Sequence, residues 1–73
     1  MLVNLYLTDG NILKECSLYP EDVKNGDLPY KTQEEITTAL YKVPWGLKYI
    51  SYQTKSLHGQ VHVNSIEKYE FVQ

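Results

Sequence analysis

One stretch of the chain, residues 32–43, carries apolar side chains at helical spacing. The apolar positions recur every three or four residues, and they are Ile36, Ala39, Leu40 and Val43. Residues spaced in this way lie on one face of an α-helix. A helix this short is marginal alone, so we expect its apolar face to pack against the rest of the chain.

The ends of this helix are marked as clearly as its face. Thr32 and Glu35 have the spacing of a capping box, in which each side chain accepts a hydrogen bond from the backbone near the other. Glu34 in the first turn and Lys42 in the last suit the helix dipole. Pro44 disfavours helical geometry at the preceding residue, so we expect the helix to end at residue 43.

Two stretches with alternating polar and apolar residues, 2–7 and 11–18, precede the helix. Asp9-Gly10 between them is a strong hairpin signal. A two-residue turn would pair Leu7 with Ile12, Leu5 with Lys14 and Val3 with Cys16. This register predicts that six side chains face the core: Val3, Leu5, Leu7, Ile12, Cys16 and Leu18.

Three further strands are expected after the helix, at residues 47–54, 60–64 and 66–72. The predicted order is β-β-α-β-β-β, which favours an α+β fold: a small antiparallel sheet of four to five strands with one α-helix packed on it. The alternative is an SH3-like small β-barrel with one helix. A short strand, a tight turn at Asn64-Ser65 and a final strand are typical of the way such barrels close.

The length of 73 residues fits a single domain, 1–73, with one small core. Such a core supplies roughly 3–5 kcal/mol, so a homodimer paired through its first or last strand would be a natural source of further stability. The apolar start of the chain lacks a basic lead and is broken by Asn4 and Asp9, so we expect no signal peptide. With a single cysteine and no long apolar run, we expect a cytoplasmic protein without membrane contact.

Charge is unevenly distributed along the chain. Residues 1–39 sum to −4 and residues 40–73 to +2, which gives the net charge of −2. All seven basic residues are lysine. The missing arginine makes specific reading of duplex DNA and phosphoryl transfer less favourable, because no bidentate donor is present. The composition is typical of an AT-rich genome, such as that of a low-GC bacterium or one of its phages.

The long irregular stretch 19–31 is acidic and framed by tyrosines. Loops of this length in small domains are often functional. We interpret it as a partner-binding surface with aromatic anchors and carboxylates that attract a basic partner. The anchors are Tyr19, Tyr30 and Trp45, and the carboxylates are Glu21, Asp22 and Asp27, which Glu34 and Glu35 could extend.

A second surface is suggested by aromatic residues that lie among lysines in the C-terminal half. Such a sheet face resembles a platform on which single-stranded nucleic acid stacks. The residues are Lys48, Tyr49, Tyr52, Lys55 and Tyr69. Packing within the sheet explains the same tyrosines more simply, and the net negative charge opposes nucleic-acid binding.

Catalytic and metal chemistry are not predicted, and no cofactor is expected. Zinc normally takes three or four nitrogen or sulfur ligands from a protein. The sequence offers only three, Cys16, His58 and His62, and one of them lies on a distant strand. No phosphate-binding glycine loop or nucleophile motif is present in the sequence. The chain is therefore not expected to be an enzyme.

These observations predict a small non-catalytic protein-interaction module. It would be a phage or mobile-element accessory protein that binds and inhibits a larger, nucleic-acid-handling host protein through the acidic loop. One alternative is a weak single-stranded nucleic-acid-binding protein. A second alternative is a structural subunit of a larger assembly.

Overall fold

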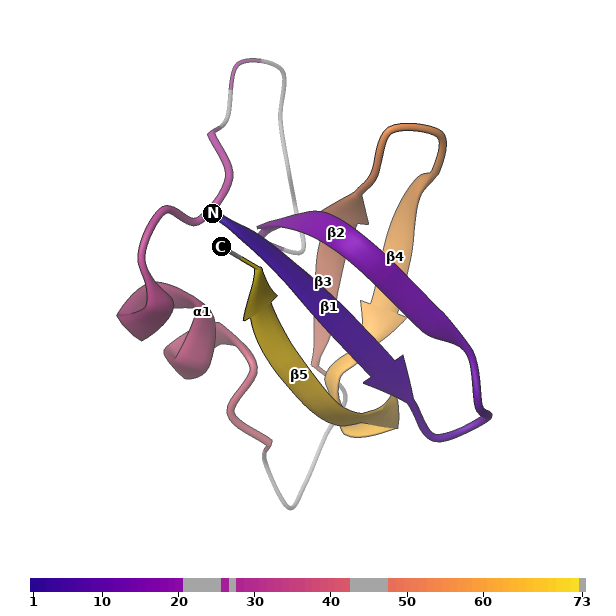
Figure 1. Cartoon of the computed structure of the whole chain (residues 1–73). Coiled ribbons are helices and arrows are strands. Elements are labelled where there is room, and N and C mark those ends of the chain that lie inside the picture. The colour runs from indigo at the N-terminus through magenta and orange to yellow at the C-terminus, as the bar shows by residue number, and fades with distance from the viewer. Residues whose placement is uncertain (21–25, 27, 43–47, 73) are drawn as a thin grey trace.

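A computed structural model of the chain describes residues 1–20, 26, 28–42 and 48–72. These residues form a five-stranded antiparallel sheet with one α-helix, in the strand order β4-β3-β2-β1-β5 (Figure 1). The elements are β1 (Leu2–Leu7), β2 (Ile12–Tyr19), α1 (Gln33–Ala39), β3 (Tyr49–Gln53), β4 (His58–His62), a 3-10 helix (Val63–Ser65) and β5 (Ile66–Val72). The predicted α+β class, the order of the elements and the bounds of the last strand are confirmed.

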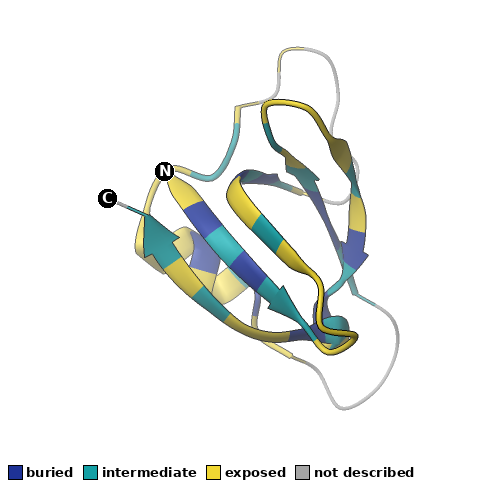
Figure 2. Ribbon diagram, turned by 45° about the vertical axis from the view of Figure 1, so that its right-hand side comes forward, coloured by how far each residue is buried: buried dark blue, intermediate teal, exposed yellow. Residues whose placement is uncertain are grey.

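The sheet is strongly bent, and β2 belongs to both of its parts. The first half of β2 pairs with β1, whereas its last residues, 17–19, pair with β3. Figures 1 and 2 show β1 and β5 on one side of the molecule and β3 and β4 on the other. β4 and β5 form no ladder with each other, so the sheet is open rather than a closed barrel. The tight turn expected between them is present as the 3-10 helix.

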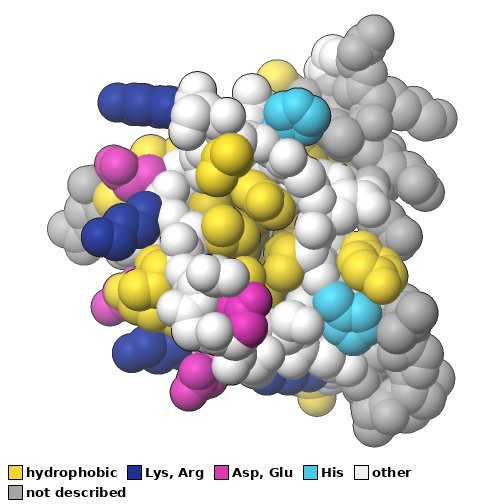
Figure 3. Space-filling model, turned by 90° about the vertical axis from the view of Figure 1, so that its right-hand side faces the viewer, with side chains coloured by type: hydrophobic (Ala, Val, Ile, Leu, Met, Phe, Trp, Pro, Cys, Tyr) yellow, Lys and Arg dark blue, Asp and Glu magenta, His cyan; other side chains and the backbone are white. Residues whose placement is uncertain are grey.

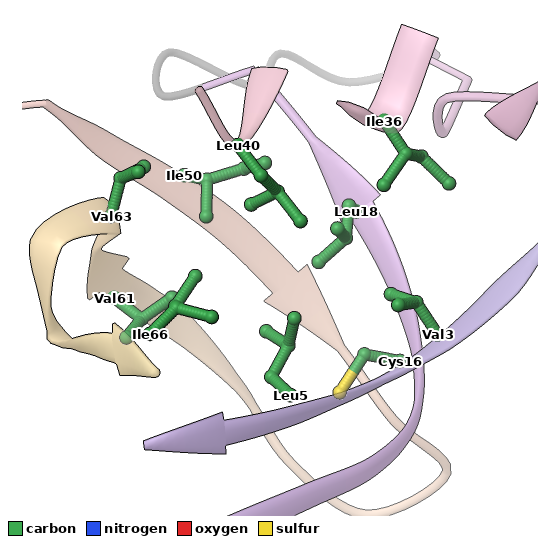
Figure 4. Close-up of a cluster of buried hydrophobic side chains, with 10 residues drawn as sticks. All are labelled: Val3, Leu5, Cys16, Leu18, Ile36, Leu40, Ile50, Val61, Val63 and Ile66. Atoms are coloured by element: carbon green, nitrogen blue, oxygen red, sulfur yellow. The ribbon is translucent and has the colours of Figure 1, made fainter. Parts of the chain in front are cut away.

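The core fills the space enclosed by the bent sheet and the helix. Figure 4 shows Ile36 of α1 pointing toward Leu18 of β2, with Leu40 beside Ile50 of β3. Ten buried side chains form the core: Val3, Leu5, Cys16, Leu18, Ile36, Leu40, Ile50, Val61, Val63 and Ile66. The helix thus packs its apolar face on the sheet, as its sequence predicts.

The register predicted for the first hairpin is wrong in its central part. Val3 does pair with Cys16, but Leu5 pairs with Leu13 and Tyr6 with Ile12. The turn is longer than two residues, because the Leu7 N–H donates to the Asn11 carbonyl at 2.9 Å. This added residue turns Ile12 outward, leaving it 47% exposed.

A β-bulge in β2 restores the original register after this shift. Glu15 has a φ of 54°, a left-handed conformation that is unfavourable for residues other than glycine. Its backbone N–H donates to Asn4 Oδ1 at 2.9 Å, which satisfies a donor that the bulge removes from the ladder. The extra residue accounts for the return of Cys16 to the core opposite Val3.

The helix is capped as predicted at its start but ends earlier than residue 43. The Glu35 N–H donates to Thr32 Oγ1 at 3.1 Å, and Glu35 Oε1 accepts from the Lys31 N–H at 3.3 Å. Leu40 is the C-cap, so Lys42 lies beyond the helix. The positive charge expected from Lys42 at the end of the helix is supplied by Lys48 instead. Its Nζ donates to the carbonyls of Thr38 and Tyr41 at 3.4 and 3.3 Å.

The second hairpin is tighter than predicted, so β4 begins before residue 60. The Thr54 N–H donates to the Leu57 carbonyl at 2.7 Å, and Thr54 Oγ1 accepts from the Leu57 N–H at 3.0 Å. β4 ends at His62 because its imidazole caps the 3-10 helix, with Nδ1 accepting from the Asn64 N–H at 3.1 Å. Among the described residues, no helix is long and apolar enough to cross a membrane.

Candidate protein-binding surface at the β2–α1 loop

The two ends of the loop between β2 and α1 are joined at the sheet. The Tyr30 N–H donates to the carbonyl of Leu18 at 2.8 Å. Leu18 is fully buried in the core, so this bond fixes the returning chain to a rigid part of β2. Residues 20–29 therefore begin and end at the same place on the molecule.

Tyr19 lies on the side of β2 opposite Leu18. It is half-buried, and its hydroxyl donates to Gln53 Oε1 of β3 at 3.4 Å. The side chain lines an open depression of about 590 Å³, together with Leu2, Lys14, Glu15, Ser17, Gln53, Thr54, Lys55 and Ser56. Tyr19 thus lies beside two lysines rather than beside the first turn of the helix.

Tyr30 lies at the helix side of the loop base. It is half-buried and packs against the core. It lines a second open depression of about 490 Å³, together with Thr32, Glu34, Glu35, Thr38, Ala39 and Lys48. An aromatic ring next to carboxylates is suited to contact with a lysine or arginine of a partner.

The structure places only part of the predicted partner-binding set. Glu21, Asp22, Asp27 and Trp45 lie outside the described residues. Tyr19 and Tyr30 do frame the base of the loop, but they line separate depressions on different sides of it. They would contact different parts of a partner.

Glu34 and Glu35 extend the acidic character of this region onto the helix. Both are exposed in the first turn of α1. Glu35 is already engaged by Thr32 and Lys31, because its Oε1 lies 3.2 Å from Thr32 Oγ1 and 3.3 Å from the Lys31 nitrogen. Glu35 is therefore held in a fixed orientation at the edge of the depression that contains Tyr30.

The five residues of the alternative nucleic-acid face are not brought together on one surface. Lys48 binds the end of α1, and Lys55 lies in the depression with Tyr19. Tyr49 packs edge-on against His62, with ring centroids 5.0 Å apart. The remaining two tyrosines, Tyr52 and Tyr69, are half-buried against the core.

Tyr52 and Tyr69 serve packing within the sheet. The ring of Tyr52 covers its cross-strand neighbour Gly59, since a Cβ built there would lie 3.4 Å from the Tyr52 hydroxyl. Tyr69 contacts Phe71 edge-on, with centroids 5.7 Å apart. These contacts favour the packing interpretation of the C-terminal tyrosines.

A polar cluster on the outer face of β1 and β5 was not predicted from the sequence. The Tyr6 hydroxyl donates to Glu70, and Lys68 Nζ lies 4.7 Å from the centroid of the Tyr6 ring. The hydrogen bond to Glu70 is the main reason why the pKa of Tyr6 is raised. No local pattern signals this cluster, because it depends on pairing between the first and last strands.

Cys16, one of the candidate metal ligands in the sequence, belongs to the hydrophobic core. Cys16 is fully buried, and this burial raises the pKa of its thiol to about 11. The thiol is therefore protonated near neutral pH and is a poor nucleophile. Among the described residues, no three His, Cys, Asp or Glu side chains gather in a group that could hold a metal ion. The absence of catalysis and of a bound metal stays a prediction.

Comparison with family models, curated proteins and solved structures gives no match to this chain. The function is therefore inferred from the residues of the chain itself.

Proposed function

We propose that the protein is a small non-catalytic interaction module that binds a larger protein through its β2–α1 loop. The observation that carries this proposal is the hydrogen bond from the Tyr30 N–H to the Leu18 carbonyl. It ties both ends of an acidic loop to the buried part of β2. A loop held at its base by a rigid sheet is a common way to present binding residues.

The partner is expected to be basic. Residues 19–35 contain five carboxylates and two lysines, a local charge of −3. Opposite charge on a partner would speed the encounter and orient the two proteins. Tyr30, beside Glu34, would receive a lysine or arginine side chain.

A basic groove that handles nucleic acid has the charge that this surface requires. An acidic module seated in such a groove would exclude nucleic acid and so inhibit the larger protein. We therefore propose a phage or mobile-element accessory role in the cytoplasm, in keeping with the AT-rich composition.

Capture from a low-GC bacterial lysate with the tagged chain tests this proposal. The expected product is a basic nucleic-acid-binding protein that added single-stranded DNA displaces. Tyr30→Ala should reduce its capture about tenfold, as expected for an aromatic anchor. Tyr41→Ala is the matched control, because Tyr41 is 71% exposed just beyond the helix and should not matter. Equal capture by folded Tyr30→Ala protein would contradict the proposed anchor.

One observation favours the second candidate function, weak binding of single-stranded nucleic acid. Lys14 and Lys55 lie with Tyr19 around the depression of about 590 Å³. A labelled oligonucleotide whose affinity falls with salt and is lost in Lys14→Gln/Lys55→Gln protein would support it. No binding at low salt would exclude this candidate.

A further inference from the structure

The last strand of the chain, β5, forms one edge of the sheet. It pairs with β1 on one side, and among the described residues no strand pairs with its other side. Figure 2 shows β5 at the margin of the sheet beside β1, and all of its residues except Ile66 are exposed or half-buried. The backbone N–H and C=O groups along such an edge can bond to another strand.

The hydrogen bonds of β1 show which backbone groups of β5 are directed outward. The Leu7 N–H donates to the Asn11 carbonyl in the first hairpin, so Leu7 bonds toward β2. Successive residues of a strand bond to opposite sides, and Tyr6 and Asn4 therefore bond toward β5.

Tyr69 lies at the middle of the open edge. The partners of Tyr6 and Asn4 on β5 are Lys68 and Glu70, whose backbone groups are thus directed toward β1. Because the direction alternates along the strand, Tyr69 directs its backbone N–H and C=O away from β1. These two groups are available to a further strand.

Two side chains of opposite charge lie on either side of Tyr69. Lys68 and Glu70 are both exposed on the outer face of the sheet, where Glu70 accepts from the Tyr6 hydroxyl and Lys68 Nζ lies 4.7 Å from the centroid of the Tyr6 ring. The sequence Lys-Tyr-Glu is complementary to itself in the antiparallel direction. Charges on an edge discourage most pairings, but this pattern favours a partner that carries the same segment.

We propose that β5 pairs antiparallel with β5 of a second copy, about a two-fold axis at Tyr69. Lys68 of each copy then lies opposite Glu70 of the other, in a non-bonded pair whose side chains are close together. The outward backbone groups of the two Tyr69 residues meet as a bonded pair. Such a contact closes on itself, because both copies use the same edge.

The charges also select this register over its neighbours. Pairings centred on Lys68 or on Glu70 would still bring outward backbone groups together, but each would place two like charges directly opposite one another. A shift by half of this step would bring the outward groups of Tyr69 against backbone groups that are directed toward β1. Only the register centred on Tyr69 satisfies both the backbone and the charges.

The opposite side of the molecule is less suited to choosing a partner. In Figure 3, hydrophobic side chains occupy the hollowed centre of the side that carries β4, between two histidines and a row of lysines. Hydrophobic contact alone selects neither a partner nor a register, whereas complementary charges do both. The proposed dimer uses neither Tyr30 nor the acidic loop, so its failure would leave the proposed function standing.

Sedimentation equilibrium of the full chain over the micromolar range tests the dimer. The expected mass is twice that of the 8.5 kDa chain. Lys68→Glu and Glu70→Lys should each raise the dissociation constant about tenfold, because each brings like charges together in both pairs of the dimer. The double variant Lys68→Glu/Glu70→Lys restores opposite charges and should return the dissociation constant to near that of the wild type.

Glu67→Lys is the matched control for Glu70→Lys. It makes the same change of charge on the same strand, but residue 67 lies opposite the uncharged Phe71 of the second copy, so the dissociation constant should not change. Circular dichroism checks that each variant is folded. A monomeric wild type, a control that is weakened as much as Glu70→Lys, or a folded double variant that associates no better than the single variants would overturn the proposal.

A cysteine crosslink tests the register itself. In a non-bonded antiparallel pair the two Cα atoms lie about 4.5 Å apart, a distance that a disulfide spans. Mild oxidation of Lys68→Cys protein mixed with Glu70→Cys protein should give a covalent dimer, while each protein alone should stay largely monomeric. Cys16 is fully buried and should not compete. Crosslinking of either protein alone to the same yield as the mixture would contradict this register.

Discussion

At the scale of single residues, the sheet depends on side chains that correct its irregularities. Asn4 accepts the N–H that the bulge at Glu15 leaves outside the ladder. His62 caps the 3-10 helix, and Lys48 binds the end of α1. The sequence predicts none of these three roles, because each depends on where the chain is placed by distant pairing. The Thr32–Glu35 capping box, which is local, was predicted correctly.

Asn4→Ala should lower the free energy of unfolding by about 1 kcal/mol, the typical loss when one hydrogen bond is removed. Glu15→Gly should instead raise the free energy of unfolding, because glycine adopts a positive φ without steric cost. Urea denaturation of both variants measures the two effects. A stabilising Asn4→Ala would show that the bulge does not need this bond.

The burial of Cys16 makes the stability of the protein depend on pH in the alkaline range. Burial raises its pKa to about 11 from the ordinary 9.0, so above pH 9 the unfolded chain loses this proton before the folded chain does. The stability that the folded state gains from the buried, protonated thiol is fully present below pH 9 and is lost as the pH rises toward 11. Thermal melts of wild type and Cys16→Ala should therefore show a steeper alkaline decline for wild type. Parallel pH profiles would mean that the thiol ionises equally in both states.

At the scale of elements, periodicity was sufficient to place one helix and five strands. Register could not be read in the same way, since it depends on turn length. Asp9-Gly10 suggests a two-residue turn, but the hydrogen bond from the Leu7 N–H to the Asn11 carbonyl encloses three residues. As a result, Leu13 rather than Ile12 packs against the core. The sequence places the two candidate anchors, Tyr19 and Tyr30, at the two ends of the loop, but it cannot show that they line separate depressions, because that depends on the sheet.

The helix provides the sharpest test at this scale. Leu40→Asp would bury an unpaired charge against Ile50, which costs more than a core of this size supplies, so the protein should be unfolded. Glu34→Gln alters an exposed side chain on the same helix and should change stability by less than about 0.5 kcal/mol. Circular dichroism melts compare the two. A cooperative, wild-type melt for Leu40→Asp would show that α1 does not pack on the sheet.

At the scale of the whole molecule, strand order decides which surfaces are available. The first strand was expected to be a possible free edge, but β1 lies between β2 and β5. The edges are β4 and β5, and only long-range pairing could reveal this. The bent sheet also places the base of the β2–α1 loop and the β4 edge at different parts of the molecule (Figure 1).

The proposed function depends on the negative charge of the β2–α1 loop. The decisive measurement is the affinity of the captured partner for the wild type and for the triple variant Glu21→Gln/Asp22→Asn/Asp27→Asn. A control triple variant, Glu15→Gln/Glu67→Gln/Glu70→Gln, removes the same charge from β2 and β5. We predict that the loop variant loses binding at least tenfold while the control retains it. Equal affinity of the loop variant and the wild type would contradict the acidic-loop mechanism.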